Sequence, residues 1–174
     1  AMAECRMGNP GRLTTDIGPV IDSEAKANIE RHIQTMRSKG RPVFQAVREN
    51  SEDAREWQSG TFVAPTLIEL DDFAELQKEV FGPVLHVVRY NRNQLPELIE
   101  QINASGYGLT LGVHTRIDET IAQVTGSAHV GNLYVNRNMV GAVVGVQPFG
   151  GEGLSGTGPK AGGPLYLYRL LANR

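Results

Sequence analysis

The chain has 174 residues, of which 40% are hydrophobic and 21% are charged, as expected for a globular domain that can bury one core. Its formal net charge of −2 at pH 7 gives no strong field of either sign to attract nucleic acid or a membrane surface. No apolar run approaches the length of a membrane span, and the first seven residues lack the apolar core of a signal peptide. We therefore expect a cytoplasmic location, a small-molecule ligand, and no nucleic-acid or membrane contact.

The first half of the chain predicts one helix and several short strands. Asp22 or Ser23 can cap a helix whose apolar residues recur at helical spacing up to Gly40. The polar stretch 45–59 is typical of a solvated loop. Short apolar runs then predict strands at 61–63, 67–70 and 84–90.

The second half alternates between helix and strand patterns. We expect a helix over 95–102, a strand at 109–115, a helix capped by Asp118, a strand at 133–136 and a final helix at 165–171. Such alternation favours crossover connections between parallel strands. The predicted fold is therefore a single α/β domain, with an open, largely parallel sheet and helices on both of its faces.

Two clusters could carry chemistry. In the first, Glu79 and Phe81 precede a buried strand across the Gly82–Pro83 turn. A carboxylate suits the paired donors of a ribose diol, and a phenyl face beside it could pack on a nicotinamide ring. The alternative is a solvated glutamate beside a core phenylalanine, which is the commoner arrangement.

The second cluster is the glycine-rich run from Asn136 to Gly163, which follows the carboxyl end of a predicted strand. Open α/β sheets place ligands at that edge, and successive backbone N–H groups there can bind an anion. A rigid connection to the last helix explains the glycines equally well.

Metal and nucleophile chemistry are not indicated. The four histidines are widely spaced, without ligand partners near them in sequence, so we expect no metal site. Cys5 has no glycine-rich turn or nearby histidine that would lower the pKa of its thiol. We interpret Cys5 as structural.

Five motifs in this order resemble the aldehyde dehydrogenase superfamily: TDIGPVI at 15–21, EVFGPV at 79–84, YGLT at 107–110, GNLYVN at 131–136 and PFGG at 148–151. Between Asn136 and Pro164 the chain is similar to the branch that oxidises glutamate γ-semialdehyde in bacterial proline catabolism. That branch includes bifunctional enzymes that also carry a proline dehydrogenase. The resemblance implies NAD as cofactor and an aldehyde bearing a carboxylate as substrate.

The resemblance also implies roles for single residues. Glu79 would hold the nicotinamide ribose, and Phe81 would pack near the nicotinamide. The backbone N–H groups of Gly141 and Ala142 would bind the substrate carboxylate, while Phe149 would line the aliphatic part of the substrate.

The resemblance places the family's catalytic cysteine and glutamate upstream of Ala1, because Cys5 lacks the expected glycine-rich context. We therefore expect residues 1–174 to be the C-terminal part of a catalytic domain, with no catalytic residue and no activity by itself. Its partners would be the rest of the polypeptide, including the NAD-binding domain, and further copies in a homo-oligomer.

Two alternatives remain at this point. The chain could be a binding or assembly module that kept the fold and lost catalysis, which the residues preceding Ala1 would decide. It could also belong to an aldehyde dehydrogenase of another specificity, which is a question about the carboxylate-binding loop.

Overall fold

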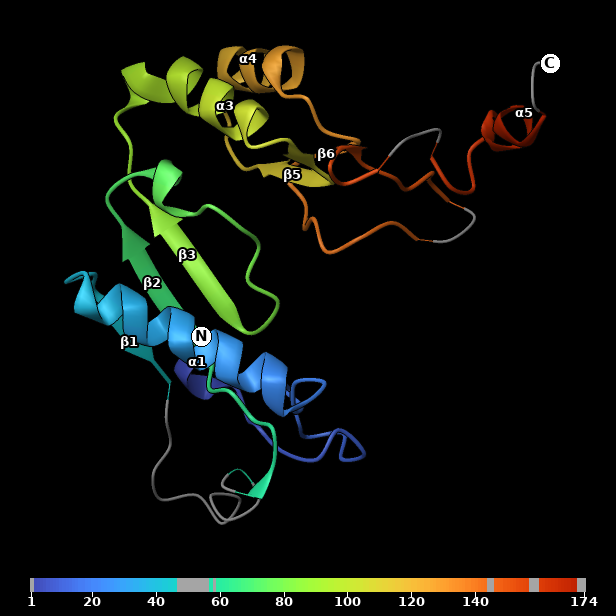
Figure 1. Cartoon of the computed structure of the whole chain (residues 1–174). Coiled ribbons are helices and arrows are strands. Elements are labelled where there is room, and N and C mark those ends of the chain that lie inside the picture. The colour runs from blue at the N-terminus through green and yellow to red at the C-terminus, as the bar shows by residue number, and fades with distance from the viewer. Residues whose placement is uncertain (1, 47–56, 58, 144–145, 157–159, 172–174) are drawn as a thin grey trace. The chain divides into compact units, whose positions relative to one another are not determined.

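A computed structural model describes residues 2–46, 57, 59–143, 146–156 and 160–171 of the chain. The fold divides into two compact units, Ala1–Arg89 and Tyr90–Arg174, each with its own elements (Figure 1). In the described part of the chain, no helix is both long and apolar enough to cross a bilayer.

Helix α1 (Ser23–Ser38) is the long helix of the first unit and forms as the sequence predicted. The Asp22 side chain caps it by accepting a hydrogen bond of 2.7 Å from the Ala25 N–H. Its apolar stripe buries Ile29, Ile33 and Met36 in the core.

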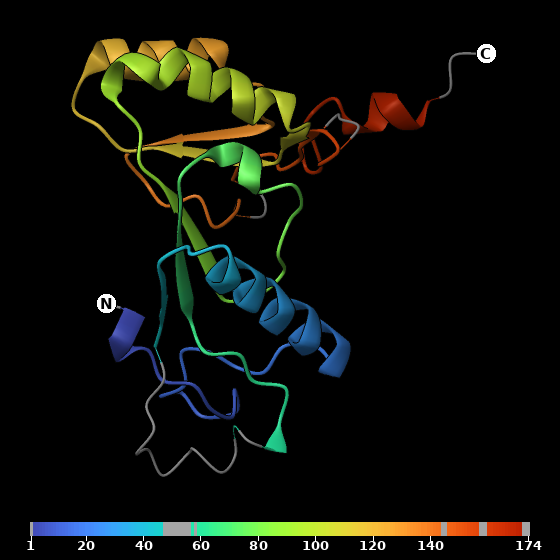
Figure 2. The same ribbon diagram turned by 60° about the vertical axis from the view of Figure 1, so that its left-hand side comes forward.

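The sheet under α1 has the order β1–β2–β3. Strand β1 (Val43–Gln45) pairs antiparallel with β2 (Thr66–Leu70), which pairs in parallel with β3 (Val84–Val88). Ile68, at the centre of β2, is fully buried. The helix packs along one face of this sheet, as Figures 1 and 2 show.

The predicted strand at 61–63 is wrong. Thr61 instead bonds twice to Val20: its carbonyl accepts from the Val20 N–H at 2.8 Å, and its hydroxyl donates to the Val20 carbonyl at 2.6 Å. Val63 is buried in the core, so the run is apolar because of burial rather than sheet pairing. Most of the predicted loop at 45–59 lies outside the described residues.

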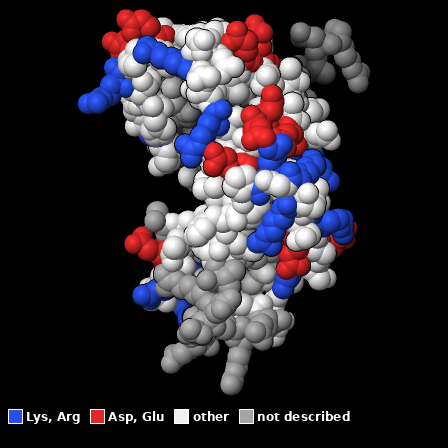
Figure 3. Space-filling view, turned by 90° about the vertical axis from the view of Figure 1, so that its left-hand side faces the viewer, with Lys and Arg blue, Asp and Glu red and all other residues white. Residues whose placement is uncertain are grey.

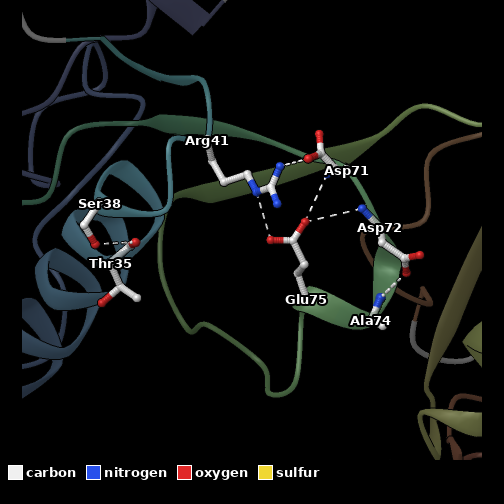
Figure 4. Close-up of polar contacts among 7 residues, drawn as sticks. All are labelled: Thr35, Ser38, Arg41, Asp71, Asp72, Ala74 and Glu75. Atoms are coloured by element: carbon white, nitrogen blue, oxygen red, sulfur yellow. Dashed lines mark hydrogen bonds and ion pairs between the residues drawn. The ribbon is translucent and has the colours of Figure 1, made fainter.

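A charged network connects the segment after α1 to the short 3₁₀ helix η2 (Phe73–Glu75), as Figure 4 shows. One Glu75 oxygen accepts from the Arg41 Nε at 2.9 Å, and the other accepts from the N–H groups of Asp71 and Asp72. Arg41 also forms an ion pair with Asp71. The network anchors the start of the connection that leads to Glu79 and Phe81.

The second unit is built on a parallel pair of strands, β5 (Thr110–Val113) and β6 (Asn132–Val135). Helices α3 (Leu95–Ala104) and α4 (Asp118–Ser127) lie side by side over the same face of this pair (Figures 1 and 2). The apolar side chains of Leu95, Ile99 and Val124 form its core.

Asp118 does not cap α4 as predicted. It is the first helical residue, Ile117 occupies the capping position, and no side chain bonds there. An acidic residue in the first turn still favours the helix through the positive end of its dipole.

The remaining elements are short. Strands β4 (Tyr107–Gly108) and β7 (Glu152–Gly153) pair antiparallel, helix α5 (Tyr166–Leu170) lies near the end of the chain, and two further 3₁₀ helices are η1 (Met2–Glu4) and η3 (Arg92–Gln94). The α/β class is therefore confirmed. In the described residues the strands form three small sheets, one mixed, one antiparallel and one parallel, and α3 and α4 lie over one face of the parallel pair.

Candidate functional site

The first predicted cluster lies on the loop before β3, against α1. Glu79 is exposed and Phe81 is 77% exposed, so Phe81 is not the core residue of the alternative interpretation. Gly82 allows the close approach of this loop, because a Cβ atom there would lie 2.4 Å from the Ile29 Cδ1 of α1. The described residues provide no hydrogen-bond partner for the Glu79 carboxylate.

A hollow of about 520 Å³ opens between this loop and α1, within the range of small-ligand sites. Glu79 and Phe81 line it from the loop, together with Lys78 and Val80. The helix contributes the side chains of Ala25, Asn28, Ile29, Arg31, His32 and Thr35. The structure thus places Glu79 and Phe81, which were both predicted to bind the cofactor, on one wall of a hollow lined by polar and apolar side chains.

A histidine pair joins α1 to β3 at this place, which sequence reasoning missed. The Nε2 atoms of His32 and His86 are 2.8 Å apart, and the rings meet edge to face at 74°. At that distance one ring must donate a proton and the other must accept it. Burial lowers the pKa of His32, with the nearby Lys78 and Lys39 charges adding to the effect. Burial also lowers the pKa of His86, and the electrostatic effect of His32 adds to the shift.

The second predicted cluster lies in the other unit, after β6. Gly141 and Ala142 are half-buried, and no described group accepts a hydrogen bond from their backbone N–H groups. Two adjacent unpaired donors can bind an anion such as a carboxylate. Gly141 does not have positive φ, and a Cβ atom there would meet none of the described residues within 4 Å. The glycine therefore relieves no backbone strain, and it leaves open space at the turn.

Phe149 lies further along the same loop system and is half-buried. Its backbone forms an isolated antiparallel bridge with Ala161, with an N–H to carbonyl distance of 3.0 Å in one direction and 2.9 Å in the other. The backbone of Phe149 is therefore held in place by its two hydrogen bonds to Ala161.

Two side chains of β6 also hold this loop system, and sequence reasoning missed both. Asn132 and Tyr134 alternate along the strand and are buried. Asn132 bonds to the backbone of Pro148 and Gly150, while the Tyr134 hydroxyl accepts from the Gln147 side chain at 3.1 Å. A polar residue at a buried strand position was the available signal.

Arg137 follows β6 and contacts the same group of residues. Its guanidinium carbon lies 4.7 Å from the centre of the Tyr134 ring, within cation–π distance, and it donates to the Gln147 amide oxygen at 3.3 Å. These contacts orient Arg137 toward Tyr134 and Gln147.

On the face shown in Figure 3, acidic and basic side chains are interspersed, without a broad patch of one sign. Among the described residues, no three His, Cys, Asp or Glu side chains come together as a metal site would require. Cys5 is half-exposed, lies just after η1 and forms no disulfide.

The first unit has a ligand-sized hollow beside a carboxylate, and the second has a parallel strand pair followed by backbone donors without an acceptor among the described residues. Each feature is typical of α/β proteins that bind small molecules in loops at sheet edges. The chain belongs to the aldehyde dehydrogenase family, whose family model matches residues 1–172.

Several relatives resemble the chain over nearly all of its length. It is 94% identical over 174 residues to the bifunctional protein PutA of Salmonella typhimurium, covering all of this chain and 13% of that protein. It is 41% identical over 163 residues to 1-pyrroline-5-carboxylate dehydrogenase 1 of Halalkalibacterium halodurans, covering 92% of this chain and 30% of that protein.

A solved 1-pyrroline-5-carboxylate dehydrogenase from Thermus, with bound NAD, superposes with a TM-score of 0.78 at 38% identity. The match covers 94% of this chain and 30% of that one. The chain therefore spans less than a third of the length of each of these three relatives.

Proposed function

We propose that the chain is the C-terminal part of the catalytic domain of an NAD-dependent dehydrogenase that oxidises L-glutamate γ-semialdehyde to glutamate in proline catabolism. The observation that carries the proposal is the 41% identity to a protein named 1-pyrroline-5-carboxylate dehydrogenase, because that compound is the cyclic imine form of the semialdehyde. The 94% identity to a bifunctional PutA supports a longer, bifunctional polypeptide, for which we propose a cytoplasmic location.

The cofactor part of the proposal rests on the hollow beside α1. Glu79 and Phe81 fit a nicotinamide riboside: the carboxylate is exposed without a partner among the described groups, and the ring presents an open face beside it. When bound, NAD would supply the hydride acceptor. The relative from Thermus, which was solved with NAD, supports this choice. Glu79 would fix the ribose, and Phe81 would limit the positions open to the ring.

The substrate part rests on the loop after β6. The N–H groups of Gly141 and Ala142, for which the described residues provide no acceptor, are suited to the carboxylate end of the substrate, because charge-assisted bonds to backbone donors need no side chain. Phe149 offers an apolar wall for the methylene groups between the carboxylate and the aldehyde. In this proposal the chain selects and orients the substrate, while the rest of the polypeptide supplies the nucleophile and the general base.

The test is a substrate comparison with the full-length polypeptide that contains this segment. We expect kcat/KM for L-glutamate γ-semialdehyde to exceed that for propanal by at least about a hundredfold, with NAD as the oxidant. Equal efficiency with the two aldehydes would indicate another specificity. A full-length protein that bound semialdehyde without oxidising it would instead indicate a binding module.

A further inference from the structure

We propose that Asn132 is a positioning residue that sets substrate selectivity, because its side chain fixes the backbone on both sides of Phe149. The inference rests on the proposed function, in which Phe149 lines the aliphatic part of the substrate. Asn132 itself touches no substrate in this scheme and acts through the turn that it holds.

The Asn132 carboxamide bonds to the backbone as a peptide group of a neighbouring strand would, with one donated and one accepted hydrogen bond. The Asn132 Nδ2 donates to the Pro148 carbonyl at 2.9 Å, and its Oδ1 accepts from the Gly150 N–H at 3.1 Å. These two groups flank Phe149 directly. Asn132 is 8% exposed, so water competes poorly for either bond.

The other edge of the same turn is bonded as well. The Phe149 N–H and carbonyl both pair with Ala161. Four consecutive polar groups, from the Pro148 carbonyl to the Gly150 N–H, are therefore satisfied, two of them by one side chain. With both edges held, the Cα–Cβ direction of Phe149 is fixed and its ring can point to only a small region.

The turn also lies directly on β6. A Cβ atom at Gly131 would be 1.8 Å from the Gly150 carbonyl oxygen, so only glycine allows this approach. Tyr134, two residues after Asn132 on the same strand face, bonds to the Gln147 side chain. Within this face, Asn132 is the residue whose side chain reaches the backbone around Phe149.

The effect on substrate selectivity depends on which substrates must pack against the Phe149 ring to be placed for reaction. A semialdehyde whose carboxylate is held by Gly141 and Ala142 must have its methylene groups correctly placed to bring the aldehyde to the reacting position. A short neutral aldehyde spans no such distance, and a displaced Phe149 ring costs it little. Loss of the Asn132 bonds should therefore change the ratio between the two substrates more than it changes the chemical step.

A matched control exists in the same unit. The Asn103 side chain also bonds twice to the backbone, donating to the Ser127 carbonyl at 2.8 Å and accepting from the His129 N–H at 2.8 Å. These bonds hold Ser127 and His129 at the end of α4, and neither bond involves a residue next to Phe149. Asn103→Ala removes the same kind and number of bonds as Asn132→Ala.

The experiment uses the full-length polypeptide and measures kcat and KM for L-glutamate γ-semialdehyde and for propanal at saturating NAD. We expect Asn132→Ala to lower the ratio of the two kcat/KM values by about tenfold or more, mainly through a higher KM for the semialdehyde. Asn103→Ala should leave this ratio within about twofold of the unmodified protein. An unchanged ratio in Asn132→Ala, or an equal change in both variants, would overturn the proposal.

Asn132→Asp keeps the shape of the side chain and provides a second test if the alanine variant does not fold. Its carboxylate can accept from Gly150 but repels the Pro148 carbonyl until it is protonated, which restores a donor. Normalised to the unmodified protein, the selectivity ratio should recover as pH falls, whereas a ratio independent of pH would contradict the proposal. An unmodified protein without preference for the semialdehyde would overturn the proposed function, and this inference with it.

Discussion

Glu79 is an exposed carboxylate whose proposed partner is a ribose diol, and this makes it the first residue to test. In the full-length polypeptide, Glu79→Ala should weaken NAD binding and slow hydride transfer, because two acceptor oxygens are lost. Hydrogen bonds to a charged group are worth about 1.5 to 3 kcal/mol, so roughly a tenfold to hundredfold effect is expected. NAD titration and single-turnover kinetics would measure it.

The matched control for Glu79 is Glu100→Ala, which removes an exposed carboxylate from α3. We expect no change in NAD affinity from this variant. If both variants behave like the unmodified protein, Glu79 is only a solvated residue.

Gly141 allows a test that leaves the fold intact. Its φ is not positive and a Cβ atom there would meet none of the described residues within 4 Å, so Gly141→Val should not distort the loop. The added side chain should obstruct a carboxylate approaching the Gly141 and Ala142 donors. We expect kcat/KM for the semialdehyde to fall by more than about tenfold, with propanal oxidised as before.

Gly126→Val is a suitable comparison for that variant, because its Cβ atom would also enter open space. It should leave both substrates unaffected. An equal loss on both aldehydes in Gly141→Val would indicate a misfolded loop, and no loss on either would mean that the carboxylate is held elsewhere, with Arg137 the next residue to test.

At the scale of elements, the His32–His86 contact makes the packing of α1 on β3 sensitive to pH. The pKa of each histidine is lowered in the folded protein, so the unfolded chain binds protons more readily. The contribution to stability is therefore fully present above the ordinary histidine pKa of about 6.5 and is lost as pH falls through the lower folded values. Two protonated rings would place two N–H groups against each other at 2.8 Å.

Hydrogen–deuterium exchange can measure this effect locally. Between about pH 7.5 and pH 5, amide protection in α1 and β3 should decrease in the full-length polypeptide, after correction for intrinsic exchange rates. A His32→Gln, His86→Gln double variant should show a smaller dependence on pH. If its protection changes with pH as much as that of the unmodified protein, the pair is not the origin of the effect.

At the scale of the whole molecule, the chain spans 13% of its bifunctional relative and 30% of the single-function one. We expect the isolated 174-residue chain to oxidise no semialdehyde above a blank, because the nucleophile and general base act as a unit and are proposed to lie outside it. NADH formation in the presence of purified chain would measure this.

Cys5 provides the complementary measurement in the full-length polypeptide. Cys5→Ser should leave turnover nearly unchanged, because Cys5 follows η1 and lacks the glycine-rich sequence context expected of the family's nucleophile. A loss of about a thousandfold or more would identify Cys5 as the nucleophile and would contradict the proposed division of roles.

Local patterns in the sequence determined much of the framework. Helical spacing and the Asp22 cap predicted α1, and apolar runs predicted β2 and β3, because these features depend on neighbours a few residues apart. The prediction failed at Thr61–Val63, where an apolar run is buried without pairing, and at Asp118, where the helix begins one residue earlier than a cap would allow. The sequence also predicted ligand-binding roles for the loop before β3 and the loop after β6, and these roles stay predictions.

Tertiary structure decided what those loops can do. The contact between His32 and His86 joins residues 54 positions apart, and Asn132 meets Pro148 and Gly150 across 16 and 18 positions. The space around Gly141 likewise depends on which segments fold against each other, and so does the contact of Gly82 with α1, where a Cβ atom would lie 2.4 Å from the Ile29 Cδ1. Residue type and spacing along the chain set local conformation, whereas these contacts arise only when distant segments pack and their buried polar groups must find partners.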